Sequence, residues 1–243
     1  MAAAGSGQRL GAGGPKAFVP LAGRSMVEWS IEACRAAASV RSIVVACPPG
    51  HIHDLAGGEV GVAGGEVGVV DGGATRVESV RNALQAVGTE LVAIHDAARP
   101  LVTPELIEGV IASLVADPDA AGAIAAARVT DTIKQVAAQE GMAPSGCNAF
   151  SLHEDEKTLH RVESTLDRGR LWAAQTPQVF PVEALRAALR ADAERVSAVT
   201  DEAMLVEAAG GKVLIHPSPA ENFKVTTTLD LALAELLLAD RAG

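Results

Sequence analysis

The chain has 243 residues, of which 49% are hydrophobic, and this is enough to bury a substantial core in one large domain or at most two small ones. Its formal net charge of −10 and its lack of Tyr argue against nucleic acid and against an anionic membrane surface as partners. Its three cysteines form no C-x-x-C pair and no apolar run reaches about 18 residues, so we expect a cytoplasmic protein without a structural zinc site or a membrane span.

The amino-terminal stretch, residues 3–16, has the sequence AAGSGQRLGAGGPK. Glycines leave backbone N–H groups uncovered, so such a loop can curl its amides around an anion. Arg9 and Lys16 add two cations, and the stretch therefore predicts a cradle for a polyphosphate. It fits neither usual phosphate-loop pattern, because no G-K-[ST] follows and Leu10 stands at the third glycine of G-x-G-x-x-G. A flexible glycine-rich tail is the alternative.

Beyond this stretch, apolar periodicity and capping residues predict an alternation of strands and helices. Ser25 with Glu28 has the spacing of a capping box, and Thr103 stands at an N-cap position. The expected helices are 26–38, 76–87, 104–116, 182–193, 201–209 and 229–239, and the expected strands are 43–46, 69–70, 91–94, 123–127 and 212–216. This order predicts an α/β fold with a mostly parallel, twisted sheet and helices on both faces.

Residues 133–168 interrupt the alternation. The segment is polar and carries the charged run HEDEK at 153–157, so we expect a projecting arm or insertion within a single domain of residues 1–243. A duplication of GGEVGV within residues 57–70 is interpreted as a surface-loop repeat, because nothing else in the chain repeats it.

Polar clusters follow several predicted strands, at the edge where an α/β sheet binds its ligands. Each cluster alone also has a structural explanation, as a turn, a helix cap or a local ion pair. Because all of them are expected on one side of one sheet, we favour the interpretation that they form a functional site. The clusters are DGGA at 71–74, HDAARP at 95–100, TDT at 130–132, QTPQ at 175–178, TDEA at 200–203 and KVT at 224–226.

Together with the glycine-rich stretch and the continuation of the 130–132 cluster to Lys134, these motifs resemble the ordered motif set of the 2-C-methyl-D-erythritol 4-phosphate cytidylyltransferase family. The resemblance covers most of the chain. It implies a nucleotidyltransferase fold of the nucleotide-diphospho-sugar transferase type and a homodimer joined by the arm, residues 133–168. It also implies transfer of CMP from CTP to 2-C-methyl-D-erythritol 4-phosphate, giving 4-diphosphocytidyl-2-C-methyl-D-erythritol and pyrophosphate in non-mevalonate isoprenoid biosynthesis.

The resemblance also implies roles for individual residues. The catalytic cations would be Arg9, Lys16, Arg168 and Lys224. CTP would be bound by Ala3, Ala4, Gly5, Gly7, Gly73, Ala74, Ser79, Asp96 and Ala97. The polyol phosphate would be bound by Arg99, Thr132, Thr176 and Thr200, with Thr132 and Arg168 reaching from the arm to the neighbouring subunit's substrate.

The chemistry of this reaction agrees with such a set of residues. The nucleophile is a phosphate that is already ionised, so catalysis needs positioning and charge neutralisation and no general base. Mg²⁺ is expected as a cofactor held mainly through CTP phosphates and waters, with no dedicated protein ligands.

The sequence departs from the family pattern in two places. The family begins with an apolar strand ahead of the glycine loop, and burial of about five aliphatic side chains in such a strand is worth on the order of 10 kcal/mol. We therefore expect about 8–15 further apolar residues ahead of Met1. Residues 140–164 resemble an insertion in the arm; its Cys147, His153 and His160 suggest a solvated loop more than a metal site.

Two other functions stay open at this point. One is a cytidylyltransferase for another polyol phosphate, such as ribitol 5-phosphate, with the same chemistry. The other is a non-catalytic nucleotide-binding relative.

Overall fold

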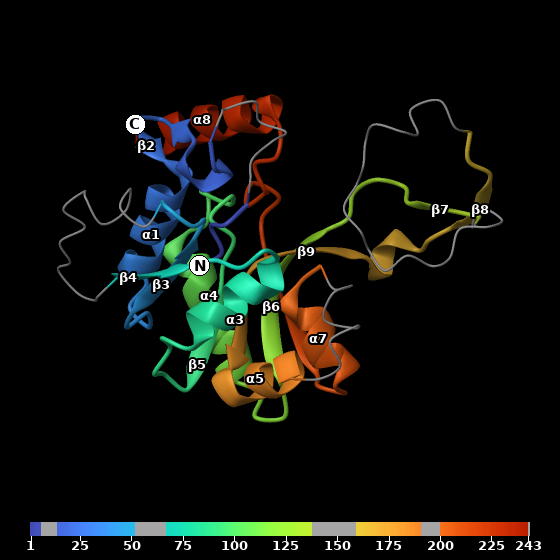
Figure 1. Cartoon of the computed structure of the whole chain (residues 1–243). Helices are drawn as coiled ribbons and strands as arrows, with labels where there is room; N and C mark the ends of the chain where they lie inside the picture. The colour runs from blue at the N-terminus through green and yellow to red at the C-terminus, as the bar shows by residue number, and fades with distance from the viewer. Residues whose placement is uncertain (6–13, 52–66, 138–158, 191–199, 243) are drawn as a thin grey trace.

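The computed structural model describes residues 1–5, 14–51, 67–137, 159–190 and 200–242 (Figure 1). Among them, the helices are η2 (Lys16–Phe18), α1 (Met26–Ala36), α3 (Arg76–Leu84), α4 (Pro104–Val115), η3 (Arg168–Arg170), α5 (Val182–Arg190), α7 (Glu202–Ala208) and α8 (Thr228–Ala242). The strands are β1 (Pro20–Leu21), β2 (Arg24–Ser25), β3 (Ile43–Cys47), β4 (Val67–Asp71), β5 (Leu91–Ile94), β6 (Gly122–Arg128), β7 (Lys134–Val136), β8 (Val162–Thr165), β9 (Trp172–Pro181) and β10 (Val213–Pro217).

The central sheet is formed by β10, β6, β9 and β5, in that order. β10 and β6 run parallel, whereas β9 runs antiparallel to both of its neighbours. The α/β fold is confirmed, and its sheet is mixed. The antiparallel direction of β9 follows from the excursion before it, because the chain enters β9 from the arm.

The amino-terminal residues join this sheet to the parallel pair β3 and β4. Ala2 forms parallel bridges with Ala46 on one side and Asp96 on the other. Its N–H donates to the His95 carbonyl at 2.8 Å, and the Ala97 N–H donates to the Ala2 carbonyl at 3.1 Å. Residues 1–3 therefore occupy the position of a short strand between β3 and the end of β5.

Helices cover both faces of the sheet. Successive residues of a strand point to opposite faces. Val92 and Ile94 of β5 pack in a cluster with residues of α3, α5 and α7. Leu91 and Ala93 pack in the cluster that contains α4. Consequently α3 and α4 lie on opposite faces, as the sequence predicts for a sheet buried on both sides.

Local signals determine where several helices begin. The Glu28 carboxylate accepts a hydrogen bond from the Ser25 N–H at 2.6 Å, so the predicted capping box of α1 is confirmed. The predicted N-cap Thr103 accepts from the Leu106 N–H at 3.3 Å. Thr75 caps α3 in the same way as Ser25 caps α1, with Glu78 as its partner.

The arm projects from the body of the molecule (Figure 1). β7 and β8 pair antiparallel, and β9 leads from the arm back into the sheet. Residues 138–158, with Cys147 and His153, lie outside the described residues. So does most of the duplicated 57–70 stretch, whose last residues enter β4.

One feature of the predicted topology is wrong. The sequence predicts residues 175–178 beyond the end of a strand, yet they lie within β9. Pro177 argues against a central strand because proline cannot donate to the ladder. The register between β6 and β9 is irregular here: Ile124 pairs with Gln178 and Ala126 with Ala174, and residues 175–177 lie opposite Ala125. This irregularity accommodates the proline and redirects the side chains beside it.

No helix among the described residues combines the length and the apolar character that crossing a bilayer requires.

Candidate active site

A polar cleft of about 370 Å³ lies where the amino-terminal segment, β4 and β5 reach their carboxyl ends. This is the edge at which α/β sheets bind ligands. The residues lining it are Ala2, Ala3, Ala4, Gly5, Lys16, Ala17, Gly73, Ala74, Thr75, Arg76, Ser79, Asp96, Ala97, Ala98 and Lys224.

Residues on both sides of 6–13 line the cleft, namely Ala3, Ala4 and Gly5 before them and Lys16 after them. The Lys16 N–H donates to the Gly5 carbonyl at 3.1 Å, so the residues flanking 6–13 are held together. Ala3 is fixed by donation from its N–H to the Ala46 carbonyl at 3.0 Å. The residues between them, with Gly7 and Arg9, lie outside the described part of the chain.

The opposite wall is the turn before α3, where two glycines are required by space. A Cβ on Gly72 would stand 2.6 Å from the Ala4 Cβ, and a Cβ on Gly73 would stand 2.2 Å from the Glu78 Cβ. The Gly73 N–H donates to the Ser79 hydroxyl at 3.0 Å, which fixes the turn on the helix. Backbone therefore reaches the cleft beside the amino end of α3, where the helix dipole favours negative charge.

Asp96, which follows β5, is the centre of the charges in the cleft. Arg76 Nε donates to Asp96 Oδ1 at 3.1 Å, and Lys224 Nζ donates to Oδ2 at 2.7 Å. Burial opposes ionisation of this carboxyl, but the charges of Arg76 and Lys224 outweigh it and hold the pKa of Asp96 well below its usual range. Lys224 is held at this position because the Val225 N–H donates to the Ala98 carbonyl at 2.8 Å.

Arg76 connects Asp96 to a second carboxylate. Its Nη1 lies 2.5 Å from both oxygens of Glu202, whose side chain is fully buried at the start of α7. Burial raises the pKa of Glu202, while Arg76 acts against this rise. A buried carboxylate without a partner is costly, so Glu202 holds Arg76 in one orientation and Arg76 in turn holds Asp96.

A buried hydrogen-bonded chain fixes the backbone around Asp96. The Asp96 N–H donates to Thr176 Oγ1 at 3.1 Å, the Thr176 hydroxyl donates to His95 Nδ1 at 2.9 Å, and His95 Nε2 donates to the Arg99 carbonyl at 3.3 Å. Burial lowers the pKa of His95 to about 4, so the imidazole is neutral at physiological pH. The ring therefore acts as a rigid connector between β9 and the 95–99 turn.

Arg99 lies on the far side of this turn. Its Nη1 donates to the Asn222 carbonyl at 2.8 Å and its Nη2 to the Ala174 carbonyl at 3.3 Å. Its Nε is buried and has no hydrogen-bond partner among the described residues. A guanidinium with an unsatisfied buried donor is suited to an additional anionic or polar partner.

The structure brings together ten of the residues that the sequence singles out. They are Ala3, Ala4, Gly5, Lys16, Gly73, Ala74, Ser79, Asp96, Ala97 and Lys224, and all of them line the cleft. Among the other described residues, Arg99, Thr132, Arg168, Thr176 and Thr200 do not line it. Thr176 is buried with its hydroxyl engaged by His95 and Asp96, while Thr200 is exposed and its hydroxyl lies 3.1 Å from Met204 Sδ.

The two residues assigned to the arm lie away from the cleft in this chain. Thr132 is exposed, and the exposed Arg168 donates from Nη1 to the Thr130 carbonyl at 2.8 Å. Their roles toward substrate stay predictions.

The sequence assigns no role to Arg76, Glu202 and His95, three ionisable residues that the structure connects to the site, although each lies inside or beside one of the motifs. Their part in the site depends on contacts between residues far apart in the chain, such as that of Arg76 with Glu202, and one sequence does not reveal these contacts.

Comparison with known proteins supports one family. A sequence model described as 2-C-methyl-D-erythritol 4-phosphate cytidylyltransferase matches residues 1–146 and 149–240. The protein of that name from Frankia casuarinae is 42% identical over 242 residues, which cover 98% of this chain and 79% of that protein. The one from Synechococcus elongatus is 40% identical and covers 98% of this chain and 94% of that protein.

Solved structures agree with this result. The 2-C-methyl-D-erythritol 4-phosphate cytidylyltransferase of Thermus thermophilus has a TM-score of 0.68 and 33% identity, covering 98% of this chain and 97% of that one. The 4-diphosphocytidyl-2C-methyl-D-erythritol synthase of Anaerococcus prevotii has a TM-score of 0.75 over 98% of this chain and 95% of that one. The sequence identity to this protein is 24%, so the similarity supports the fold alone.

The mixed sheet with its cationic cleft beside a glycine turn therefore defines a nucleotidyltransferase. Within that class the comparisons are specific. The chain belongs to the 2-C-methyl-D-erythritol 4-phosphate cytidylyltransferase family.

The contact between Arg76 and Glu202 leads to a first prediction. In Glu202→Gln the side chain keeps its size but loses its charge, so Arg76 is left with Asp96 alone and competes with Lys224 for it. We expect the free energy of unfolding to fall by about 3 kcal/mol, as when a buried ion pair loses one partner. We expect kcat to fall about tenfold, with a smaller change in KM for CTP, because the charges are displaced rather than removed. Chemical denaturation and steady-state kinetics measure both effects.

The matched control for this prediction is Glu207→Gln, an exposed position on the same helix. It should leave stability and kcat unchanged. If Glu202→Gln behaved like Glu207→Gln, the proposed positioning of Arg76 by Glu202 would be wrong.

The buried His95 leads to a second prediction, on pH. The unfolded chain takes up a proton on His95 near pH 6.5, whereas the folded protein takes it up only near pH 4. Stability from the neutral ring is fully present above pH 6.5 and is lost as pH falls toward 4, by on the order of 3 kcal/mol. His95→Asn, which keeps an acceptor for Thr176, should flatten the Tm-versus-pH curve between these values.

The comparison with His95→Asn isolates the histidine. Burial raises the pKa of Glu202, which gives a pH dependence of opposite sign, and this contribution is common to both proteins. His160→Asn, at an exposed position of the arm, serves as the control. Equal slopes for the unsubstituted protein and His95→Asn would contradict the assignment of this pH dependence to His95.

Proposed function

We propose that this CTP-dependent cytidylyltransferase transfers CMP from CTP to 2-C-methyl-D-erythritol 4-phosphate in the polar cleft. The observation that carries the proposal is that Lys16, Arg76 and Lys224 share one cleft with the amino end of α3 and a wall of small residues. Three cations beside a helix amino end suit a triphosphate. Small residues suit a flat base that is recognised through backbone groups.

The lining residues of the cleft differ in chemistry, and this gives CTP an expected arrangement. Ala3, Ala4, Gly73 and Ala74 are small and uncharged, so cytosine and ribose would be bound beside them through backbone groups. Lys16 and Lys224 are cations that would contact the phosphates. The α-phosphorus would lie near Asp96, whose carboxylate binds Lys224.

The reaction requires no general base. An oxygen of the acceptor's phosphate forms a bond to the α-phosphorus of CTP, while the bond from that phosphorus to the bridging oxygen breaks. Pyrophosphate leaves with the electron pair. Both reactants are anions, so the residues act by bringing them together and by neutralising charge on the leaving phosphates. Lys16, and with it the predicted Arg9, would neutralise the leaving group.

Mg²⁺ is part of the proposal as a cofactor carried by CTP. Asp96 is the one carboxylate among the described residues that line the cleft, and no group of three or more potential ligands occurs in the described chain. One carboxylate with phosphate oxygens and waters is a usual environment for Mg²⁺, so the residues fit. When bound, the ion would neutralise phosphate charge, with Asp96 as its protein contact.

The acceptor would approach from the side of Arg99, whose buried Nε has no partner among the described residues. We further propose that the chain is one nucleotidyltransferase domain, 1–243, that acts as a cytoplasmic homodimer through the arm, 133–168. Exposed apolar side chains on β7 and β8, Val136 at 45% and Val162 at 53%, support a contact there. Thr132, Thr200 and Arg168 would then complete the acceptor site, Arg168 and Thr132 from the partner subunit.

The function is tested by pyrophosphate release with CTP and a single acceptor. We expect turnover with 2-C-methyl-D-erythritol 4-phosphate and at least about a hundredfold lower kcat/KM with ribitol 5-phosphate, since a site built around one polyol leaves polar groups unpaired with another. Turnover with ribitol 5-phosphate alone would assign the other polyol. Tight CTP binding without any turnover would assign a non-catalytic nucleotide-binding protein.

The prediction for catalysis concerns Lys16. Lys16→Ala should lower kcat by roughly a hundredfold or more, the scale of losing one preorganised charge-stabilising group. Stability should change little, because the side chain buries little apolar area. Lys212→Ala is a charge-matched control, since Lys212 pairs with Asp117 at 2.6 Å on the surface, outside the cleft. Full turnover of Lys16→Ala would remove Lys16 from the catalytic cations.

A further inference from the structure

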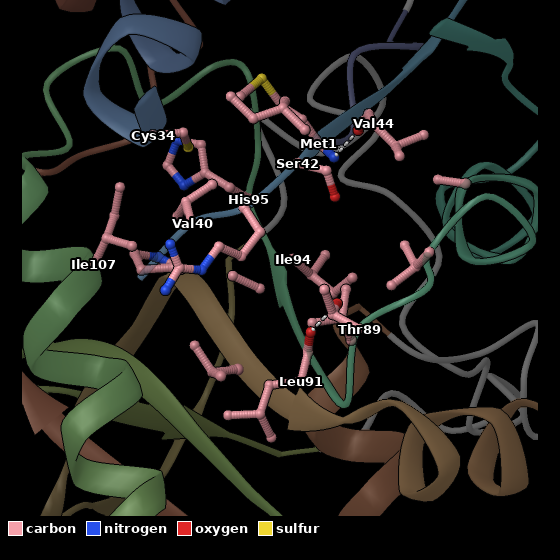
Figure 2. A pocket seen from close by; sticks show the side chains of 18 of the residues that line it. Met1, Cys34, Val40, Ser42, Val44, Thr89, Leu91, Ile94, His95 and Ile107 are labelled. Atoms are coloured by element: carbon pink, nitrogen blue, oxygen red, sulfur yellow. Dashed lines mark hydrogen bonds between the residues drawn. The ribbon is translucent and has the colours of Figure 1, made fainter. Parts of the chain in front are cut away.

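The turn 95–99 borders both the polar cleft and a second cavity. This second cavity, of about 290 Å³, lies beside β3 and β5 and is lined mostly by apolar side chains, so we call it the apolar cavity. Figure 2 shows His95 among its lining residues, together with Ile94. Walls of this kind offer few hydrogen bonds, and the polar contacts that orient Arg99 come from β9 and from residues 217–225.

The guanidinium of Arg99 joins two segments that are far apart in the sequence. Its Nη1 donates to the Asn222 carbonyl at 2.8 Å, and its Nη2 donates to the Ala174 carbonyl of β9 at 3.3 Å. Both acceptors are backbone groups, so the direction of the guanidinium depends on how these two segments are held against each other. The side chain that holds them together is that of Asn222.

The side-chain amide of Asn222 donates both of its hydrogens to β9. Its Nδ2 lies 2.8 Å from Gln175 Oε1 and 2.9 Å from the Thr176 carbonyl. Asn222 is 2% exposed, so water cannot replace these hydrogen bonds. The side chain therefore fastens to β9 the same residue whose carbonyl receives Arg99.

Gln175 extends this connection to the residues before Asn222. Its Oε1 also accepts from the Ser218 hydroxyl at 2.8 Å, and its Nε2 donates to the Pro219 carbonyl at 3.4 Å. The Ser218 N–H donates to the Ala126 carbonyl of β6 at 2.8 Å. Residues 218–222 are thus held on the buried side chain of Gln175 and on the sheet.

The orientation of the Asn222 amide is determined by its neighbours. Turning it over would place its oxygen against two other oxygens, those of Gln175 and Thr176. In the observed orientation Oδ1 is buried and has no partner among the described residues, which is costly. An apolar residue would avoid this cost but could not donate to β9. The arrangement therefore favours a role of Asn222 in positioning over a role in packing alone.

We propose that Asn222 is a positioning residue for the acceptor, acting through Arg99. By fastening its own segment to β9, it fixes the carbonyl that orients the guanidinium toward the acceptor side of the cleft. The proposal rests on the proposed function, in which the acceptor approaches from the side of Arg99. Asn222 itself contacts none of the reacting atoms.

The effect of Asn222 is expected to be selective for the acceptor over CTP. Lys224, two residues further along, is held independently of the Asn222 side chain. The Val225 N–H donates to the Ala98 carbonyl at 2.8 Å, and Lys224 Nζ donates to Asp96 at 2.7 Å. The cation that would contact the phosphates of CTP therefore stays in place when the Asn222 amide is removed.

Steady-state kinetics test this selectivity. In Asn222→Ala we expect KM for 2-C-methyl-D-erythritol 4-phosphate to rise at least about tenfold and KM for CTP to change less than about twofold, since only the acceptor is misplaced. Ser113→Ala is the control for lost stability, because it removes a hydrogen bond to His216 outside the cleft and should change neither KM. An unchanged acceptor KM in Asn222→Ala, or an equal rise of both KM values, would overturn the proposal.

A double-mutant cycle tests whether Asn222 acts through Arg99. Arg99→Met removes the guanidinium, so nothing is left for Asn222 to orient. The double variant should have kcat/KM for the acceptor within about threefold of Arg99→Met alone, because the two residues act as a unit. A merely structural role of Asn222 predicts instead that the two separate losses multiply, and that result would overturn the proposal.

Asn222→Asp tests whether donation by the amide is what matters. The variant keeps the shape of the side chain, but its carboxylate faces Gln175 Oε1 and the Thr176 carbonyl without hydrogens to donate. We expect a loss of kcat/KM for the acceptor at least as large as in Asn222→Ala. Acceptor kinetics equal to those of the unsubstituted protein would show that these hydrogen bonds do not position Arg99.

NMR of protein labelled with ¹⁵N-arginine gives a readout that does not require turnover. The Nε–H signal of Arg99 is assigned by its loss in Arg99→Lys. We expect this hydrogen to exchange with solvent at least about tenfold faster in Asn222→Ala and at an unchanged rate in Ser113→Ala. Unchanged exchange in Asn222→Ala would overturn the proposal, whatever the activity. Absence of turnover in the unsubstituted protein would count against the proposed function alone.

Discussion

The structure of the site depends on the ion pairs of Asp96. Its carboxylate is shared by Arg76 from α3 and Lys224 from the segment before α8, while its backbone is held by Thr176 of β9 and bridged to Ala2. Four segments far apart in the chain therefore meet at one residue. A carboxylate that is almost fully buried is tolerable only because both of its oxygens accept from cations. Because Asp96 binds both Arg76 and Lys224, it holds these two cations where they line the cleft.

The amino-terminal segment connects the two cavities of the molecule. Residues 1–3 lie between β3 and the end of β5, with the apolar cavity behind them and the polar cleft ahead. Close approach of Ala4 to Gly72 then places the segment against the turn before α3. The geometry of the nucleotide-binding side is thus set by backbone contacts within the sheet, and a change in the sheet is transmitted to the cleft through a few residues.

Much of the fold could be predicted because its signals are local. The predicted helix 104–116 and strand 91–94 match α4 and β5, since amphipathic periodicity, an N-cap at Thr103 and an uninterrupted apolar run each act within a few residues. The direction of β9 could not be predicted. Proline at 177 indicates a loop, and only pairing with β5 and β6, distant in sequence, keeps this segment in the sheet. The role of Glu202 could not be predicted for the same reason, because its burial and its contact with Arg76 depend on the tertiary structure.

Charge balance in the network determines how it can respond to a polyphosphate. Arg76 and Lys224 face Asp96 and Glu202, so these four side chains are neutral together. Arg76 is held by two carboxylates, one of them fully buried, and turning it away would leave Glu202 without its ion-pair partner. Lys224 has one carboxylate partner in the network and its side chain is 42% exposed. We therefore expect Lys224 to be the cation that exchanges its carboxylate for phosphate oxygens, while Arg76 stays on Glu202 and keeps Asp96 ionised and in place.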